Sequence, residues 1–235
     1  MSSIRQNTEE IKSRIAAAAV RSGRKPDDVK LIAVTKLHEA SEVDEAALAG
    51  ITDVGENKVQ ELCLKQPMVK AALNWHLIGH LQTNKVKQII GKVSLIHSVD
   101  SLHLAEEINK RAESSGIMQD ILIQVNAAGE VQKSGICPQE TEQLIRDISG
   151  SCCNINIKGL MFIAPAADDP EDVRVYFKEV KTLFDRLSVL SLDRVTMEIL
   201  SMGMSGDYEV AIEEGSTMVR IGTAIFGQRD YSKKQ

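Results

Sequence analysis

Eight successive pairs of a strand and a helix are the feature of this sequence that most restricts its fold. Short apolar runs typical of buried strands alternate along the chain with longer segments that suit helices. Because parallel strands need crossover helices, and eight such units close a sheet on itself, we predict an α/β fold with a single (β/α)8 barrel of the TIM type. The predicted strands are 30–36, 53–55, 74–79, 94–98, 120–125, 155–163, a run ending at Ser201 and a run ending near Gly222.

A helix precedes the first strand, since Ser3 and Gln6 can form a capping box and Gly23 supplies a stop. Helices are also predicted over 83–91, after the third strand, and around Pro138, placed in the first turn of the helix after the fifth. We therefore expect one domain over residues 1–235, with the extra N-terminal helix at about 3–23, the barrel at about 30–227 and a short C-terminal tail. An open doubly wound sheet is the main alternative, but no G-x-G-x-x-G follows any predicted strand.

The net charge of the chain argues against nucleic acid and anionic lipid as partners. A formal net charge of -5 and a sequence pI near 5.6 give no overall basic field for nucleic acid or anionic lipid. Neither a leader nor a membrane-length apolar run is evident, so we predict a cytoplasmic protein. The four cysteines lack paired spacing, and the residues between His76 and His80 are typical of the end of a strand rather than of one helical face, so no metal site is predicted.

The carboxyl ends of the strands of a barrel surround one cavity, so chemistry is expected there. Lys36 ends the first predicted strand, where desolvation and neighbouring cations favour the neutral, nucleophilic amine. The loop 201–205 and the pair Gly222-Thr223 offer hydroxyl and backbone N–H groups to a phosphate. Arg220 shares a strand face with Gly222. An amine, a fixed cation and two phosphate loops together favour an aromatic aldehyde phosphate, pyridoxal 5′-phosphate (PLP), as the ligand.

Each of these residues also has an ordinary interpretation. A solvated Lys36 would simply begin a loop, and Arg220 would form an ion pair with an acidic residue such as Glu198 or Glu56. The convergence of all the groups on one end of the barrel favours the binding site over both interpretations.

Several ordered motifs resemble those of the pyridoxal phosphate homeostasis proteins, the YggS/PROSC family. The resemblance extends from about the first helix to Gly227, which is nearly the whole chain. It implies a fold-type III PLP barrel, similar to the N-terminal domain of bacterial alanine racemase. The motifs are AVTK (33–36), GENKVQE (55–61), WHLIGHLQTNK (75–85), LSMGMSGD (200–207) and VRIGTAIFG (219–227).

The resemblance also implies a role for each matching residue. Lys36 is the Schiff-base lysine that holds PLP covalently, Arg220 faces the pyridine nitrogen, and Asn57 lines the pocket near the ring. The residues that hold the phosphate are Ser201, Gly203, Gly222 and Thr223.

An arginine beside the pyridine nitrogen argues against efficient catalysis. PLP enzymes draw electrons into a protonated ring, whereas a guanidinium only donates hydrogen bonds and leaves that nitrogen unprotonated. Alanine racemase adds a tyrosine base from a second domain, for which this chain is expected to have no room. We therefore expect a protein that binds PLP and releases it to apo-enzymes without efficient catalysis, and we expect it to be a monomer. The family resemblance implies a role in vitamin B6 homeostasis and, through it, in amino-acid metabolism. The alternatives are a weak PLP-dependent amino-acid racemase or lyase, a Schiff-base aldolase and a purely structural barrel.

Overall fold

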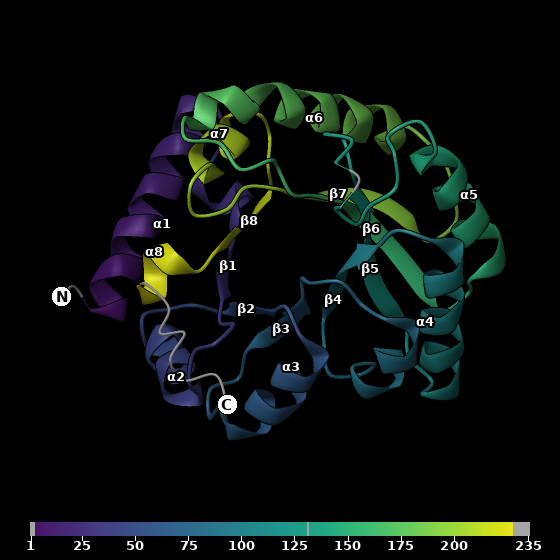
Figure 1. Ribbon diagram of the computed structural model, residues 1–235, viewed down its shortest axis with the longest axis horizontal. Helices are drawn as coiled ribbons and strands as arrows, with labels where there is room; N and C mark the ends of the chain where they lie inside the picture. Colours follow the sequence, from purple (N-terminus) through teal and green to yellow (C-terminus); the bar gives the residue numbers. More distant parts are fainter. Residues whose placement is uncertain (1–2, 131, 228–235) are drawn as a thin grey trace.

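The computed structural model describes residues 3–130 and 132–227, and its centre is a closed barrel of eight parallel strands in sequence order (Figure 1). The prediction of a (β/α)8 barrel is confirmed. The predicted C-terminal tail lies outside the described residues. The strands are β1 (Lys30–Val34), β2 (Asp53–Glu56), β3 (Asn74–Leu77), β4 (Leu95–Val99), β5 (Gln119–Val125), β6 (Ile155–Phe162), β7 (Val195–Ser201) and β8 (Met218–Ile221).

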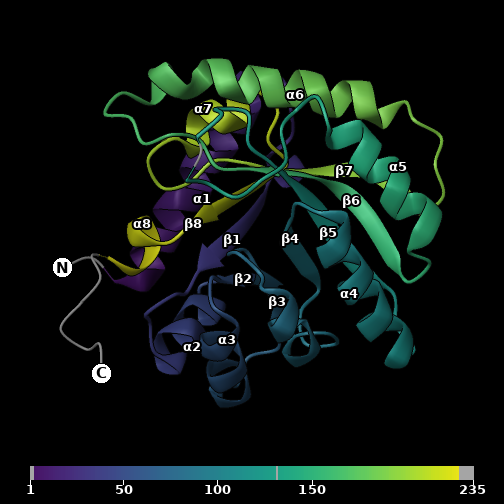
Figure 2. The ribbon, with the colours of Figure 1, turned by 45° about the vertical axis from the view of Figure 1, so that its right-hand side comes forward.

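Helices surround the barrel on its outside, as both ribbon views show (Figures 1 and 2). None of the described helices is long and apolar enough to cross a membrane. The α-helices are α1 (Ile4–Arg21), α2 (Ala40–Leu48), α3 (Val59–Lys65), α4 (Leu102–Ser114), α5 (Thr141–Ser151), α6 (Arg174–Ser188), α7 (Tyr208–Glu213) and α8 (Thr223–Phe226). The 3-10 helices are η1 (Pro26–Asp28), η2 (Gln66–Met68), η3 (Thr83–Gln88) and η4 (Pro170–Val173).

Two predicted helices differ from the structure. The segment after β3 is a 3-10 helix that ends at Gln88, because its turns close through i,i+3 bonds such as those from the N–H of Lys85 to Gln82 and from the N–H of Ile89 to Val86. Pro138 precedes α5 instead of occupying its first turn, because the chain first pairs Ile136 with Val125 at the end of β5. Strand β1 also ends earlier than predicted, so Lys36 lies in the turn after it.

Helix α1, which precedes the barrel, packs against α7 and α8, which follow its last two strands (Figure 2). The predicted capping box of Ser3 and Gln6 is present, and Ile11 and Ile15 are buried. Asn7 Nδ2 donates to the carbonyl oxygen of Ile225 at 2.8 Å. Helix α1 therefore holds the loops after β7 and β8 in place.

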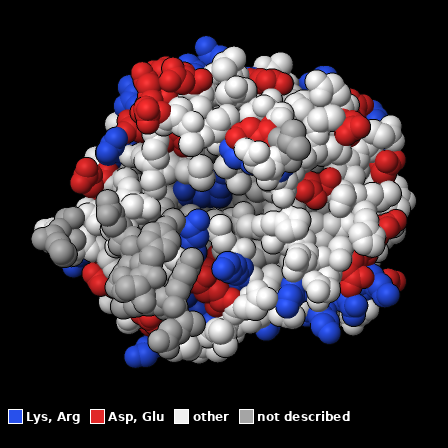
Figure 3. Space-filling model, viewed as in Figure 1, with Lys and Arg blue, Asp and Glu red and all other residues white. Residues whose placement is uncertain are grey.

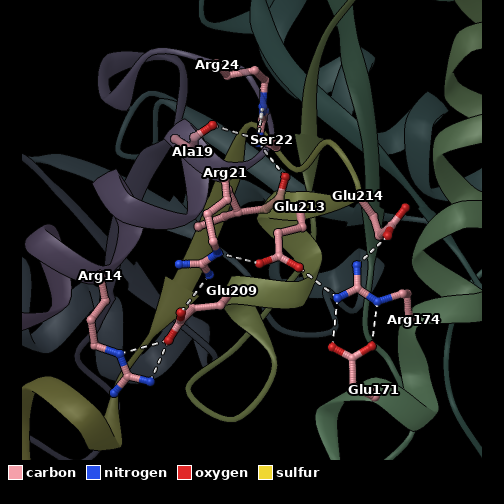
Figure 4. A network of polar contacts seen from close by, with 11 residues as sticks. Arg14, Ala19, Arg21, Ser22, Arg24, Glu171, Arg174, Glu209, Glu213 and Glu214 are labelled. Atoms are coloured by element: carbon pink, nitrogen blue, oxygen red, sulfur yellow. Dashed lines mark hydrogen bonds and ion pairs between the residues drawn. The ribbon is translucent and has the colours of Figure 1, made fainter.

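An ion-pair network on the outside strengthens this packing (Figure 4). Glu209 of α7 accepts hydrogen bonds from Arg14 and Arg21 of α1, and Arg21 also binds Glu213. Glu213 binds Arg174 of α6 at 2.7 Å, so a single network joins three helices. These side chains are partly exposed, and each pair contributes little alone, but the network fixes α7, which follows the loop after β7.

The barrel interior divides into an apolar and a polar part. A small cluster of buried side chains from five of the eight strands fills one part, consisting of Ile32, Leu95, Leu122, Met161 and Met218. The other part contains buried polar groups that interact with one another, among them two histidines, a serine and an arginine. Buried polar groups cost free energy unless they are paired, so this second part points to a site.

Candidate cofactor site

Three adjacent strands bring Lys36, Asn57 and Thr223 to the same rim. In the pairing register, Ala33 of β1 lies opposite Val54 of β2 and Ile221 of β8. Each of the three residues follows the carboxyl end of its strand. A Cβ added to Gly222 would lie 3.1 Å from the carbonyl oxygen of Val34, so the loops after β1 and β8 are in close contact. The amine of Lys36 and the loop after β8 are therefore close enough to line a common pocket.

The turn that carries Lys36 is held by a buried cluster of charges. Lys65 Nζ donates to the carbonyl oxygen of Thr35 at 2.6 Å and to Glu56 Oε1 at 2.6 Å. Glu61 Oε1 accepts from Lys65 and from the backbone N–H of Leu37 at 2.5 Å. Leu37 has a φ of 65°, an unusual backbone conformation for a leucine. The cluster thus fixes the backbone on both sides of Lys36.

Burial dominates the electrostatics of this cluster. It raises the pKa of Glu56, against the opposing effect of the Lys65 charge. The sequence motif contained Glu56 and Glu61, but the role of Lys65 was missed. Its spacing of four residues from Glu61, on a helix that follows a buried acidic residue, was the available signal.

The loops after β7 and β8 form a cradle of small residues. Gly203 has a φ of 96°, and a Cβ there would lie 2.7 Å from Ala211 Cβ, so only glycine fits. Its carbonyl oxygen accepts from the backbone N–H of Arg220 at 3.0 Å. Ser205 Oγ accepts from the N–H of Gly222 at 3.3 Å. Gly203 and Gly222 are thus brought together with Ser205, which the predicted set of site residues did not include.

Thr223 completes the cradle at the start of α8, where it is exposed. The first N–H groups of a helix have no acceptor within the helix, and they can donate to a phosphate. Neutral hydroxyl and backbone groups therefore make up this side of the rim.

Arg220 is buried inside the barrel, with only 4% of its surface exposed. Its Nη1 donates to Ser201 Oγ at 2.6 Å, and its Nη2 donates to the carbonyl oxygen of Phe162 at 2.8 Å. Burial lowers its pKa to about 10, so the guanidinium stays charged at neutral pH. Within residues 3–130 and 132–227 it forms no ion pair. Glu56 pairs with Lys65 and Glu198 with Lys158 instead.

Ser201 lies deeper than the other residues predicted to hold phosphate. Its fully buried hydroxyl contacts Arg220 on one side and His97 Nδ1, at 3.2 Å, on the other. Because its hydroxyl bonds Arg220 and His97, Ser201 supports Arg220 from inside the barrel. Ser205, and not Ser201, is the serine next to Gly222. His97 was not singled out from the sequence, because a lone histidine in an apolar strand carries no local signal.

Asn57 borders a cavity of about 220 Å³ at the mouth, together with Gly79, His80, Gln124 and Lys133. The Oδ1 atom of Asn57 is buried and has no hydrogen-bond partner. An unpaired buried acceptor is costly, so it indicates a ligand donor at this position. Figure 3 shows the face seen in Figure 1, with a hollow near its centre that contains basic side-chain atoms.

The residues at the mouth fit PLP on these observations. The cradle offers donors for a dianion, Asn57 has an unused acceptor, and Arg220 has N–H groups beyond the two already bonded. Tyr208, in contrast, packs its buried ring against Arg14 of α1, on the outside of the barrel.

Comparisons with known proteins identify the family of the chain. Residues 2–230 match the family model described as alanine racemase, N-terminal domain. The chain is 46% identical over 219 residues to the pyridoxal phosphate homeostasis protein of Aquifex aeolicus, covering 93% of this chain and 95% of that protein. It is 39% identical over 238 residues to the Escherichia coli K12 protein of the same name, with 100% of both chains covered.

Solved structures with the same barrel fold include relatives of this chain. The PLP-bound structure of PipY from Synechococcus elongatus has a TM-score of 0.80 and 35% identity, and the match covers 92% of this chain and 100% of PipY. Alanine racemase of Clostridium difficile has a TM-score of 0.75 at 19% identity over 56% of its chain, and shares the fold. From the barrel, the motifs and these full-length relatives, the chain belongs to the pyridoxal phosphate homeostasis protein family.

Proposed function

We propose that this protein binds PLP at the mouth of the barrel and takes part in PLP homeostasis. Lys36 would hold the aldehyde carbon covalently, and Gly203, Ser205, Gly222 and Thr223 would bind the phosphate. Asn57 would contact the cofactor near its ring. When bound, the cofactor supplies an electrophilic aldehyde and an electron-accepting pyridine ring. PLP-bound PipY, at 35% identity, supports this assignment.

The observation that carries the proposal is the environment of Arg220. A buried guanidinium without a carboxylate partner, among the described residues, is arranged to donate to a neutral acceptor. The pyridine nitrogen is such an acceptor, and a donor that stays charged does not protonate it. The ring then accepts electrons poorly, which favours storage of the cofactor over turnover of amino acids.

The finer parts of the proposal follow from this weak electron sink. We propose that the protein releases PLP to apo-enzymes and has no efficient catalysis of its own. Its relatives are named as PLP homeostasis proteins and not as enzymes, which supports this conclusion. A single PLP-binding domain over residues 1–235, a monomeric state and a cytoplasmic location stay predictions of the same proposal.

Borohydride reduction of the PLP-loaded protein, followed by peptide mapping, tests the binding site. We expect one pyridoxylated peptide, containing Lys36, and loss of that label in Lys36→Ala. Lys133→Ala is a matched control, because Lys133 is another lysine that borders the cavity at the mouth, where it bonds Glu130 and the carbonyl oxygen of Ala164. A label on another lysine would overturn the assignment.

Two measurements separate storage from the alternatives. Mixing the loaded protein with an apo PLP enzyme should restore that enzyme's activity, while incubation with L-amino acids should leave their enantiomer ratio unchanged. Brisk racemisation or decarboxylation would favour the racemase or lyase. A protein that stays colourless with PLP but cleaves sugar phosphates would favour the aldolase.

A further inference from the structure

A continuous line of buried hydrogen bonds runs through the barrel from Arg220 to Asp53. Ser201 Oγ lies 3.2 Å from His97 Nδ1, His97 Nε2 lies 3.0 Å from His76 Nδ1, and His76 Nε2 lies 3.0 Å from Asp53 Oδ1. All five side chains are at most 4% exposed, and they come from β8, β7, β4, β3 and β2. We call these five residues the relay.

The chemistry of the end groups fixes the direction of every bond in the relay. Arg220 can only donate, so Ser201 accepts from it, while the Asp53 carboxylate can only accept, so His76 Nε2 carries a proton. In a neutral His76, Nδ1 is then an acceptor, and His97 Nε2 must donate to it. This leaves His97 Nδ1 as the acceptor for the proton of Ser201.

The reverse arrangement is ruled out by its unpaired groups. A doubly protonated His76 would require Nδ1–H on His97, which would then point at Ser201. The Ser201 hydroxyl proton would have no acceptor, because the described partners of Ser201 are Arg220 and His97. An unpaired donor in so buried a place is costly.

Charged groups stand at both ends of the relay. Lys30 Nζ, half exposed on the opposite end of the barrel, lies 3.2 Å from Asp53 Oδ1, and Thr52 also bonds Asp53. At the other end, the charge of Asp207, on the loop after β7, raises the pKa of Arg220 against the effect of burial. Burial lowers the pKa of His97 well below its usual value, and the charge of Arg220 acts in the same direction. His97 is therefore a neutral link.

We infer that His97, His76 and Asp53 are positioning residues for Arg220, and that the relay sets how the guanidinium donates to the ring nitrogen of PLP. The hydroxyl of Ser201 donates a hydrogen bond to His97, so its oxygen accepts from Nη1 of Arg220. The remaining N–H groups of Arg220 are then directed toward the mouth. This inference rests on the proposed PLP site. It extends that site to the opposite end of the barrel.

The first test uses the PLP-free protein and is independent of the proposed function. In 15N-histidine NMR spectra we expect a proton on Nε2 of both His76 and His97 and no proton on Nδ1 of either ring. Asp53→Asn should alter the signals of both rings, since the acceptor loses its charge. An Nδ1–H tautomer at either ring in the unsubstituted protein would overturn the inference.

The second test measures PLP binding and the pH dependence of the visible band of bound PLP. Ser201→Ala should weaken binding about tenfold, and His97→Leu and Asp53→Asn should move the midpoint of the pH titration by about half a unit or more. Ser216→Ala is the matched control. Ser216 is equally buried next to the same strands, but its hydroxyl bonds only backbone carbonyl oxygens.

The outcomes separate the two proposals. If the unsubstituted protein binds no PLP at Lys36, the proposed function fails, although the tautomers can still be as expected. If it binds PLP and the His97 and Asp53 variants titrate like the unsubstituted protein and the Ser216 variant, the relay has only a structural role and the inference fails.

Discussion

The loops on the two sides of the candidate site are held by different kinds of interaction. The turn after β1, which carries Lys36, is fixed by the buried charges of Glu56, Lys65 and Glu61. The loops after β7 and β8 are fixed by backbone bonds, a glycine with positive φ and the hydroxyl of Ser205. Buried ion pairs thus hold one side, whereas backbone and hydroxyl groups hold most of the other, where the Asp207 carboxylate accepts from the backbone N–H of Met204.

The difference fits what each side is proposed to bind. A phosphate needs donors that are already oriented and have no competing anion, which backbone N–H groups and hydroxyls provide. A reactive amine needs a fixed backbone, and buried ion pairs specify a single geometry at a cost in desolvation. We therefore expect substitutions on the lysine side to affect folding, and substitutions on the phosphate side to affect binding.

The largest expected effect is that of Lys65→Met. It leaves Glu56 buried without its counter-charge and should lower the free energy of unfolding by about 3–5 kcal/mol. Lys110→Met, at an exposed position of α4, should change it by less than about 0.5 kcal/mol. Urea titration measures both. Equal small effects would show that the charged cluster does not hold the Lys36 turn.

Gly203→Ala should be the next most damaging change. The new Cβ meets Ala211 and the backbone has a φ of 96°, so we expect a loss of about 1–3 kcal/mol together with weaker PLP binding. Gly150→Ala is its control, because Gly150 lies in α5 with no atom within 4 Å of an added Cβ. That change should stabilise the protein by up to about 1 kcal/mol. Unimpaired PLP binding by Gly203→Ala would contradict the cradle.

Asp53 should make the free energy of unfolding depend measurably on pH. Burial alone would raise its pKa, but hydrogen bonds from His76 and Thr52 and the charge of Lys30 lower it from 3.8 to about 2. A lowered acidic pKa stabilises the fold above pH about 4, and this contribution, about 2 kcal/mol, is lost as the pH falls toward 2.

Thermal unfolding from pH 7 to pH 2 checks this expectation. The stability difference between the unsubstituted protein and Asp53→Asn should be largest at neutral pH and shrink in acid. Asp168→Asn, at an exposed position, should show no such difference. A constant difference across the range would contradict the assigned pKa.

The smallest expected effect is that of Ser205→Ala. Loss of one neutral hydroxyl from the cradle should weaken PLP binding about fivefold and leave stability nearly unchanged. Binding of pyridoxal, which lacks the phosphate, is the matched control and should be unaffected. If both ligands bind more weakly by the same factor, Ser205 does not contact the phosphate.

Much of the fold follows from local patterns. Alternating strands and helices predicted the barrel, and the capping box of Ser3 and Gln6 predicted where α1 begins. Local patterns failed for the segment after β3, whose turns close through i,i+3 hydrogen bonds, and for Pro138, where pairing of Ile136 with Val125 comes before the helix. The strand bridge is a tertiary contact, which a local pattern does not contain.

The candidate site divides in the same way. The sequence by itself determined that Lys36, Asn57, Gly203, Arg220, Gly222 and Thr223 follow or lie on strands of one barrel, because strand order and alternation are properties of the chain. Only the tertiary structure decided that Ser201 lies behind Arg220, that Ser205 lies beside Gly222, and that Lys65 holds the Lys36 turn. It also joined Asp53, His76 and His97, which are far apart in sequence, into one line. The physical reason is that closing the barrel buries side chains from different strands together, and buried polar groups must then find partners among whatever neighbours closure provides.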